Sequence, residues 1–388
     1  MTLTHSPWRA LSALLAAAAL ATACGGVDSG GTGQTAQTSS AGRISGFGSV
    51  IVNGVRFDDT QARIVDENGV ARTRDDLKLG MTVDVTGELR GNSGNGVAQS
   101  IQFGNEIAGP VESVDVAGST LLVLGQLVRV DADTLFNGYA NGLADAVAGD
   151  LVEVFAFYDS VATAYTATRI ERKATLAAFK LRGRISTLNT PDKSFSLGGA
   201  LVDYGSIAPP ALPQLANGLS VRVSLQTTPV AGRWVATSVH TSQRVFPEAN
   251  EAELEGFISN FVSSASFSVA GIAVDASGAS VRRGRLGDLA DGERVEVEGQ
   301  MRNGVLVARL VEFKRGGNQE FELYGAIESV DTPAQTFVLR GMTVAYDGST
   351  VFAAGTAASL QVGAQLEVRG TPSAGGVSLR ARLIRFTP

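Results

Sequence analysis

The chain contains almost no histidine and a single cysteine, and these scarcities limit the chemistry it can perform. Two of its 388 residues are histidine, one is cysteine, and aromatic residues make up 6%. His5 lies close to the start, so His240 is the only histidine in the remainder. Transition-metal sites with nitrogen and sulfur ligands need several such side chains. The sequence therefore predicts no metal site of this kind, no catalytic residue set and no cofactor.

The first 24 residues have the pattern of a secretory signal. Arg9 precedes an apolar run over residues 10–20 that is too short to span a bilayer. The segment Ala21-Thr22-Ala23-Cys24 resembles the lipobox of bacterial lipoprotein signals, in which the cysteine thiol receives a diacylglyceryl group. We expect residues 1–23 to be a lipoprotein signal peptide and Cys24 to be lipidated. An ordinary secretory signal with a chance cysteine is the alternative.

The residues after the cysteine bear on the location of the protein. Gly25 stands where an aspartate would imply inner-membrane retention, so the resemblance implies an outer-membrane lipoprotein of the bacterial cell envelope, facing the periplasm or the exterior. Residues 24–41 are rich in Gly, Ser, Thr and Gln, a composition typical of flexible linkers. We expect a lipidated, disordered tether over 24–41 that joins the folded part to the membrane.

The rest of the chain repeats one unit five times, at intervals of roughly 70 residues. Three landmarks recur in one order: a Gly-x-[Ile/Val] start, a turn glycine before an alternating strand, and a closing Ala-x-x-[Ile/Val]. The starts are Gly42, Gly109, Gly183, Gly256 and Gly325; the turn glycines are Gly80, Gly149, Gly218, Gly292 and Gly363; the closing alanines are Ala98, Ala167, Ala236, Ala308 and Ala381. They predict β repeats at 42–104, 105–174, 178–244, 252–315 and 320–388.

Each unit predicts five strands. A hairpin with a glycine at its tip follows the start, and Asn53-Gly54 is the clearest type I′ turn signal. A polar segment such as 75–79 comes next and predicts one helical turn or a loop, followed by two more strands. This order predicts an all-β chain of five tandem OB-like five-stranded barrels. Small β-sandwich modules are the alternative, because periodicity does not distinguish closed from open sheets.

The junctions between units differ in length and composition. Residues 104–105 form a short junction, whereas 245–251 and 315–319 contain Pro or Gly and charged residues and predict hinges. Modules of this size are individually marginal, so contacts between neighbours would stabilise them. The sequence leaves open whether the units stack or remain separate beads.

The first copy resembles a known family. Its segments Gly46-Phe47-Gly48-Ser49-Val50-Ile51-Val52-Asn53-Gly54-Val55-Arg56-Phe57 and Leu79-Gly80-Met81-Thr82-Val83-Asp84-Val85-Thr86-Gly87 are similar to the bacterial repeat family catalogued as Domain of Unknown Function 5666. The other four copies share only the landmarks. The resemblance implies a tandem envelope lipoprotein and supplies no activity or catalytic residues.

Acidic residues recur at two positions of the repeat. Where the third strand ends, the copies have Asp58, Arg129, Asp203, Asp275 and Ala345; Asp59, Asp131 and Asp133 lie nearby. Calcium binding is conceivable there, but turn capping by the aspartates is favoured, because no copy has a full ligand set. In the fourth strand, Asp84, Glu153, Arg222, Glu296 and Glu367 share one position. An acidic stripe or the solvent-facing half of an alternating strand would explain them, and the second is favoured.

Charge and composition argue against nucleic acid as a partner. The formal net charge is −6, and single-strand binders need a basic groove with stacked aromatic rings. The basic cluster Arg282-Arg283-Gly284-Arg285 would suit lipid headgroups or anionic glycans, although a solvated loop is favoured.

We therefore expect a non-enzymatic, lipid-anchored binding or scaffold array, whose partners are the membrane and an envelope protein or polysaccharide. One alternative is an oligosaccharide-binding OB-like protein, against which the single tryptophan after the leader, Trp234, argues. The other is a hydrolase that uses His240 in a triad. The ligand-binding residues are unknown at this point.

Overall fold

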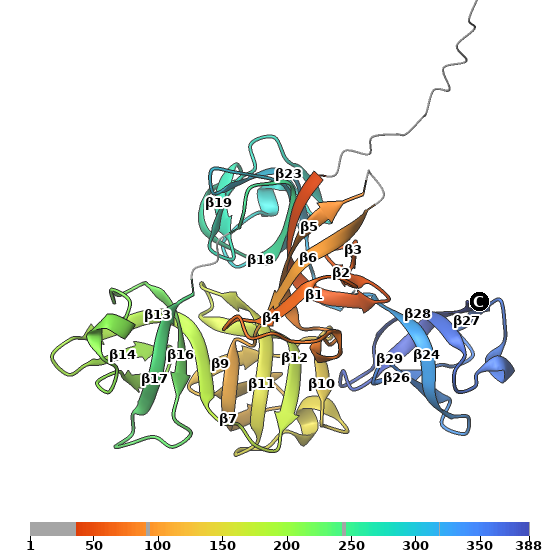
Figure 1. Ribbon diagram of the computed structural model, residues 1–388, viewed down its shortest axis with the longest axis horizontal. Helices are drawn as coiled ribbons and strands as arrows, with labels where there is room; N and C mark the ends of the chain where they lie inside the picture. Colours follow the sequence, from red (N-terminus) through yellow and green to blue (C-terminus); the bar gives the residue numbers. More distant parts are fainter. Residues whose placement is uncertain (1–35, 91–93, 243–245, 318, 388) are drawn as a thin grey trace, which may run out of the picture. The chain divides into compact units, whose positions relative to one another are not determined.

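The computed structural model describes residues 36–90, 94–242, 246–317 and 319–387, and in these ranges the chain is all β (Figure 1). Its secondary structure consists of strands and one-turn 3-10 helices, without an α-helix. No helix in this part of the chain is long and apolar enough to cross a membrane. The predicted signal peptide, Cys24 and most of the tether lie outside the described residues.

Barrel 1 covers residues 36–103, and barrel 2 covers 107–173. The elements of barrel 1 are β1 (Ala36–Phe47), β2 (Val50–Val52), β3 (Val55–Asp58), β4 (Arg63–Asp66), η1 (Arg74–Asp76), β5 (Thr82–Leu89) and β6 (Asn95–Phe103). Those of barrel 2 are β7 (Ile107–Asp115), β8 (Thr120–Val123), β9 (Gln126–Arg129), β10 (Leu135–Asn137), η2 (Gly142–Asp145), β11 (Leu151–Asp159) and β12 (Ala164–Lys173).

Barrel 3 covers residues 179–241, with β13 (Phe179–Asn189), β14 (Ser194–Leu197), β15 (Ala200–Asp203), η3 (Pro209–Ala211), β16 (Ser220–Leu225) and β17 (Trp234–Thr241). Barrel 4 covers 249–313, with β18 (Ala249–Ser263), β19 (Ser266–Val269), β20 (Ile272–Asp275), β21 (Ser280–Arg282), η4 (Leu286–Asp288), β22 (Arg294–Arg302) and β23 (Val305–Phe313). Barrel 5 covers 321–386, with β24 (Phe321–Asp331), β25 (Thr336–Leu339), β26 (Met342–Ala345), β27 (Val351–Ala353), η5 (Ala357–Ser359), β28 (Gln365–Pro372) and β29 (Leu379–Phe386).

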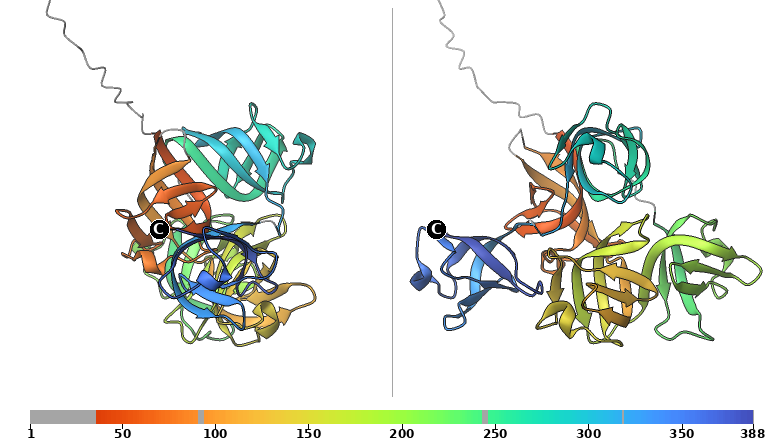
Figure 2. Two further views of the ribbon diagram at one scale, coloured as in Figure 1. Left: turned by 90° about the vertical axis from the view of Figure 1, so that its right-hand side faces the viewer. Right: turned by 180° about the vertical axis from the view of Figure 1, so that it is seen from behind.

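The five main strands of each repeat close into a ring. In barrel 2, β7 pairs with β8, β8 with β9, β9 in parallel with β12, β12 with β11, and β11 again with β7. The corresponding pairings close the other four barrels. Figure 2 shows barrel 4, in teal, as a closed ring in its right-hand view. The predicted OB-like barrel is confirmed, and the sandwich alternative is wrong.

The three sequence landmarks correspond to defined backbone features. In four hairpins the residue before the tip glycine has a positive φ, as a type I′ turn requires: Asn53, Leu124, Ala270 and Arg340. The closing alanine lies at a β-bulge, since the ladder between the last two strands shifts register beside it in every barrel. A bulge bends the strand and increases its twist, which helps a short sheet to close.

The segment between the third and fourth strands contains a short strand that the sequence did not reveal. β4, β10, β21 and β27 each pair in parallel with the last strand of their barrel. Each precedes a 3-10 turn, as the expected helical turn predicted. Barrel 3 has the turn at Pro209–Ala211 and no such strand between Asp203 and Ser220. Its prolines lack the backbone donors that a ladder needs.

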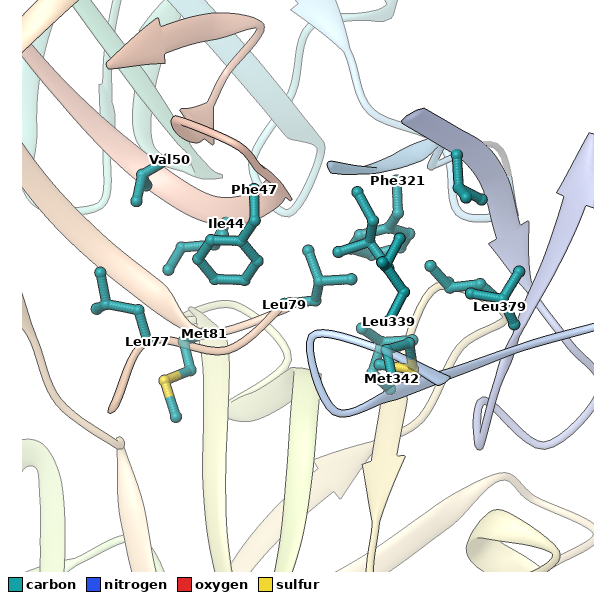
Figure 3. Close-up of a cluster of buried hydrophobic side chains, with 14 of the residues drawn as sticks. Ile44, Phe47, Val50, Leu77, Leu79, Met81, Phe321, Leu339, Met342 and Leu379 are labelled. Carbon is teal, nitrogen blue, oxygen red and sulfur yellow. The ribbon is translucent and has the colours of Figure 1, made fainter. Parts of the chain in front are cut away.

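The first strands of the barrels also pair with one another. β1 pairs in parallel with β18, from Thr38 opposite Glu251 to Ala41 opposite Leu254. It also pairs in parallel with β24 at Phe47, and β7 pairs antiparallel with β13 at Ile107. The apolar clusters follow these pairings. One cluster combines Ile44 and Phe47 of barrel 1 with Phe321 and Leu339 of barrel 5, among others (Figure 3).

These pairings correct two expectations. Strand β1 begins at Ala36, so residues 36–41 belong to barrel 1 and not to the tether. Thr38, Ser39 and Ser40 are polar and gave no apolar signal, yet they are buried because β5 and β18 flank them. The hinge predicted over 245–251 is also wrong in its extent, because β18 begins at Ala249 and includes the last three of these residues.

Candidate functional site

The residues singled out in the sequence do not form a catalytic site. Cys24 lies outside the described residues. His240 is exposed on β17 opposite Arg222, and its imidazole has no hydrogen bond to a serine or a carboxylate in the part of the chain that the structure describes. The triad that a hydrolase would need is therefore not assembled around it.

The aspartates at the end of the third strand cap turns, as favoured. The Asp58 carboxylate accepts a hydrogen bond from the Thr60 amide at 3.1 Å, Asp203 from the Gly205 amide at 2.7 Å, and Asp275 from the Ser277 amide at 3.0 Å. These are Asx turns. No group of three or more potential metal ligands occurs among the described residues.

The shared acidic position of the fourth strand does not form an acidic stripe. Its carboxylates pair with basic residues on the neighbouring strand: Glu153 with Lys173 at 2.8 Å, Glu296 with Lys314 at 2.7 Å, and Glu367 with Arg385 at 2.8 Å. Cross-strand pairs of opposite charge stabilise a sheet. Glu296 is buried, and its burial raises its pKa despite Lys314.

The strongest candidate site is a cleft along barrel 3, where this barrel faces barrels 1, 2 and 4; we call it the seam cleft. It consists of three hollows of about 660, 350 and 340 Å³. The two largest share Tyr158, Ser160 and Arg184 in their walls. The 350 and 340 Å³ hollows share Glu106, Arg182 and Ser242. The three hollows therefore form one series, each in the size range of ligand pockets.

Barrels 2 and 3 are joined directly beside the cleft. The Gly199 amide donates to the Gly125 carbonyl at 2.9 Å, so the two hairpin tips meet. The Gln126 side-chain amide donates to the Leu197 carbonyl at 2.7 Å. A side chain at Gly125 would contact the Gly199 backbone at 2.6 Å, which explains the glycine at this tip. The wall of the 660 Å³ hollow is thus held by hydrogen bonds between barrels.

An ion pair lies where the two smaller hollows meet. Arg182 of β13 lies 3.4 Å from a carboxylate oxygen of Glu106, the residue before β7, and this neighbour raises the pKa of Arg182. The Tyr165 hydroxyl donates to the Arg182 carbonyl, and burial raises the pKa of Tyr165 well above its usual value. The atom of Arg182 that faces Glu106 is Nε, whereas Ser242 Oγ is buried without a hydrogen-bond partner in the described residues.

The middle of the cleft contains the aromatic ring of Tyr158 and the unpaired guanidinium of Arg184. Tyr158 is half-buried and packs on Tyr165 with ring centroids 4.8 Å apart. Arg184 is exposed, and its guanidinium makes no ion pair or hydrogen bond with any residue of the described ranges. Phe257, Gly256 and Gly271 of barrel 4 complete the wall of the 350 Å³ hollow.

A second feature that the sequence did not reveal is a buried ionic junction between barrels 1, 2 and 4. Arg43 lies 3.8 Å from both Asp133 and Glu255, and Arg294 lies 2.8 Å from Glu255. All four side chains are buried. Burial alone would raise the pKa of Glu255, but Arg294 and Arg43 outweigh it and lower that pKa. The Phe157 ring lies under the Arg294 guanidinium at 4.6 Å.

The same junction holds the segment between barrels 4 and 5. The amides of Gly317 and Gln319 each donate to the Asp133 carboxylate at 3.0 Å. The expected hinge over 315–319 is therefore tied to barrel 2. The Gly-rich composition of this segment predicts a hinge. The sequence pattern does not reveal the contact, because Asp133 lies far away in the sequence.

Three regions of the chain match the family model described as Domain of unknown function (DUF5666): residues 108–171, 255–312 and 324–385. These repeats belong to the DUF5666 family. They coincide with barrels 2, 4 and 5, whereas the resemblance noted in the sequence was carried by barrel 1. Barrels 1 and 3 have the same ring of strand pairings as the three DUF5666 barrels.

Comparison with other proteins adds little to the DUF5666 assignment. A search of the curated proteins found no match. A solved structure titled "drosophila Unr CSD456" is 12% identical and covers 55% of this chain and 98% of its own, with a TM-score of 0.14. A likeness at this level carries no weight, and the barrel topology stated above comes from the strand pairings alone.

Proposed function

We propose that this protein is a non-enzymatic binding and scaffold protein of the bacterial cell envelope, in which the five barrels support one ligand site, the seam cleft. The observation that carries the proposal is the series of three hollows with shared walls where barrel 3 faces barrels 1, 2 and 4. Concave sites of this size at module boundaries are where ligands usually bind.

The proposed attachment to the membrane is through lipid on Cys24. The lipobox-like segment before it supports this part of the proposal. In a Gram-negative host, the wild-type chain should incorporate a labelled palmitate analogue and sediment with outer membranes. A Cys24→Ser variant should lose the label and leave the membrane fraction. Equal labelling of both proteins would contradict the anchor.

The ligand site is tested by filling the cleft. Ser160 lies in the wall shared by two hollows, so Ser160→Trp should block them. Gln226→Trp, at an exposed position after β16, is the matched control because Gln226 lines none of the three hollows. We expect an immobilised panel of envelope glycans and purified envelope proteins to contain a ligand. Ser160→Trp should weaken its binding about tenfold or more, whereas unchanged binding would exclude the cleft.

Oligosaccharide binding is the second candidate, and the aromatic side chains of the cleft favour it. Tyr158 and Phe257, both half-buried, line the 350 Å³ hollow. Trp234, whose isolation argued against sugar binding, packs edge-on against Phe179 at 5.6 Å and lines none of the three hollows. A sugar platform here would therefore use tyrosine and phenylalanine.

A further inference from the structure

We propose that the ligand of the seam cleft is an acidic oligosaccharide, a glycan chain whose carboxylate pairs with Arg184 while its rings follow the cleft. This inference rests on the proposed function, since it names the ligand class of the same site. Four features support it: the free guanidinium of Arg184, the neutral polar lining of the cleft, the unpartnered hydroxyl of Ser242, and the closed barrels that form the walls.

Arg184 is the free cation of the cleft. Two other arginines line the hollows, and both are engaged: Arg182 with Glu106 at 3.4 Å, and Arg222 with the Glu67 carbonyl at 2.8 Å and the Asn68 side chain at 3.0 Å. Arg184 has no such partner and belongs to both larger hollows. A guanidinium binds a carboxylate through two parallel hydrogen bonds.

The lining around Arg184 suits a hydroxylated ring. The 660 Å³ hollow contains no other charged side chain, and its polar side chains are neutral: Gln126, Tyr158, Ser160, Thr163, Ser186 and Asn260. Neutral hydroxyl and amide groups both donate and accept hydrogen bonds, as sugar hydroxyls do. The Tyr158 ring beside them offers an apolar face to the carbon side of a sugar ring.

The wall shared by the 350 and 340 Å³ hollows supplies one further donor. Ser242 Oγ is buried there without a hydrogen-bond partner in the described residues. Buried polar groups of folded proteins are almost always satisfied, so an open hydroxyl in a cavity wall is suited to a ligand acceptor. The oxygen of a sugar hydroxyl would accept a hydrogen bond from it.

An acidic peptide is less suitable than a glycan. Extended peptides gain most of their affinity by adding a strand to a sheet edge. The strands in the cleft walls already pair on both sides: β8 with β7 and β9, β9 with β8 and β12, and β13 with β14 and β16. A peptide would therefore bind through its side chains only, whereas a glycan needs no backbone partner.

The test compares one glycan in two charge states by titration calorimetry with the full chain. The probes are tetragalacturonic acid and its fully methyl-esterified form, which has the same rings without the charge. We expect the wild type to bind the acid about tenfold more tightly than the ester, the typical worth of a charge-assisted pair. Arg184→Gln should bind both at the level of the ester, and Arg63→Gln, an exposed unpaired arginine of barrel 1, should behave as wild type.

Several outcomes would overturn the inference. A preference for the acid that survives Arg184→Gln but disappears in an Arg282→Gln, Arg285→Gln double variant would place the anion on the basic cluster of barrel 4. Arg184-dependent binding of oligoglutamate with no glycan binding would assign the site to peptides. Equal binding of acid and ester, lost in Ser160→Trp, would remove the acidic ligand and leave the proposed function intact. If the wild type binds neither glycan, the ligand class is wrong, and the protein probes of the panel decide the proposed function separately. The urea midpoint of each variant shows whether it is folded.

Discussion

At the scale of single residues, Glu253 shows how one barrel changes the chemistry of another. It alternates with apolar residues on β18, which predicts an outward, solvated carboxylate. In the structure β1 covers it, and Ser40 Oγ donates to the Glu253 carboxylate at 3.2 Å. Burial raises the pKa of Glu253 well above its usual value, and Glu296, Glu298 and Glu251 add to the rise.

This position predicts a pH dependence of stability. A carboxyl group with a raised pKa in the folded state favours folding fully below its unfolded pKa, and the contribution is lost as pH rises through the folded pKa. Glu253→Gln keeps an acceptor for Ser40 and removes the charge. We expect the variant to be more stable than wild type at neutral pH in urea unfolding, with the difference vanishing near pH 4.

The control for this prediction is Asp192→Asn in barrel 3. Asp192 lies 2.8 Å from Arg233, and both side chains reach solvent, so the pair should contribute at most about 1 kcal/mol. A Glu253→Gln variant that is less stable than wild type at neutral pH would mean that the carboxylate is ionised and satisfied in the folded protein.

At the scale of elements, the hairpin tips of barrels 1 and 4 predict opposite effects when asparagine and alanine are exchanged between them. Asn53 has φ 51° and donates to Ser40 Oγ at 3.1 Å and to the Ala41 carbonyl at 3.0 Å. Ala270 has φ 48° at the equivalent tip of barrel 4. Asn53→Ala should destabilise the protein by about 2–3 kcal/mol through two lost hydrogen bonds and a strained alanine. Ala270→Asn should stabilise it by ~0.5–1 kcal/mol.

Thermal unfolding of the two single variants and of the double variant checks this prediction. The hydrogen bonds of Asn53 are to Ser40 and Ala41 of its own barrel and do not involve Ala270, so the effects should be nearly additive. Destabilisation by Ala270→Asn would show that contacts around this tip outweigh the turn preference; the tip is crowded, since a Cβ added at Gly256 would lie 3.1 Å from Ala270 Cβ.

The sequence predicts the elements well and the contacts between barrels poorly. Tip glycines, turn glycines and closing alanines are local signals, and each corresponds to a backbone feature within its own barrel. The sequence does not predict the short strands β4, β10, β21 and β27, because three or four residues are too few to show an alternating pattern. The sequence does not predict the seam cleft either. Tyr158, Arg184 and Ser242 belong to separate strands and junctions, and they come together only when the barrels are assembled.

At the scale of the whole molecule, Asp133 connects segments that are distant in sequence. Its carboxylate faces Arg43 of barrel 1 and accepts the Gly317 and Gln319 amides. Asp133→Ala should leave Arg43 with Glu255 alone and the Gly317 and Gln319 amides without this acceptor, at a cost of about 3–5 kcal/mol. We expect the calorimetric unfolding transition to split, because barrel 2 loses an ionic contact with barrel 1 and its tie to the segment between barrels 4 and 5.

The comparison for Asp133 is Asp331→Ala, which removes a carboxylate that caps an exposed turn by accepting the Ala334 amide at 3.0 Å. This variant should lower the transition temperature slightly without dividing the transition. A single, undivided transition in Asp133→Ala would show that other contacts, such as the hydrogen bond from Arg169 to the Leu79 carbonyl, are enough to couple barrels 1 and 2.

The parallel pairing of β1 with β18 has a consequence for the order of folding. Ser40 and Glu253, which meet in this pairing, are 213 positions apart. During synthesis from the N-terminus, β1 closes barrel 1 long before β18 exists, so the outer edge of β1 has no partner strand while barrels 2 and 3 are made. Open edges invite association with other chains. That edge carries Thr38, Ser39 and Ser40, whose hydroxyl groups are able to hydrogen-bond to water until β18 covers them. The pairings of β1 with β18 and then with β24 are therefore completed only when the fourth and fifth barrels have been made.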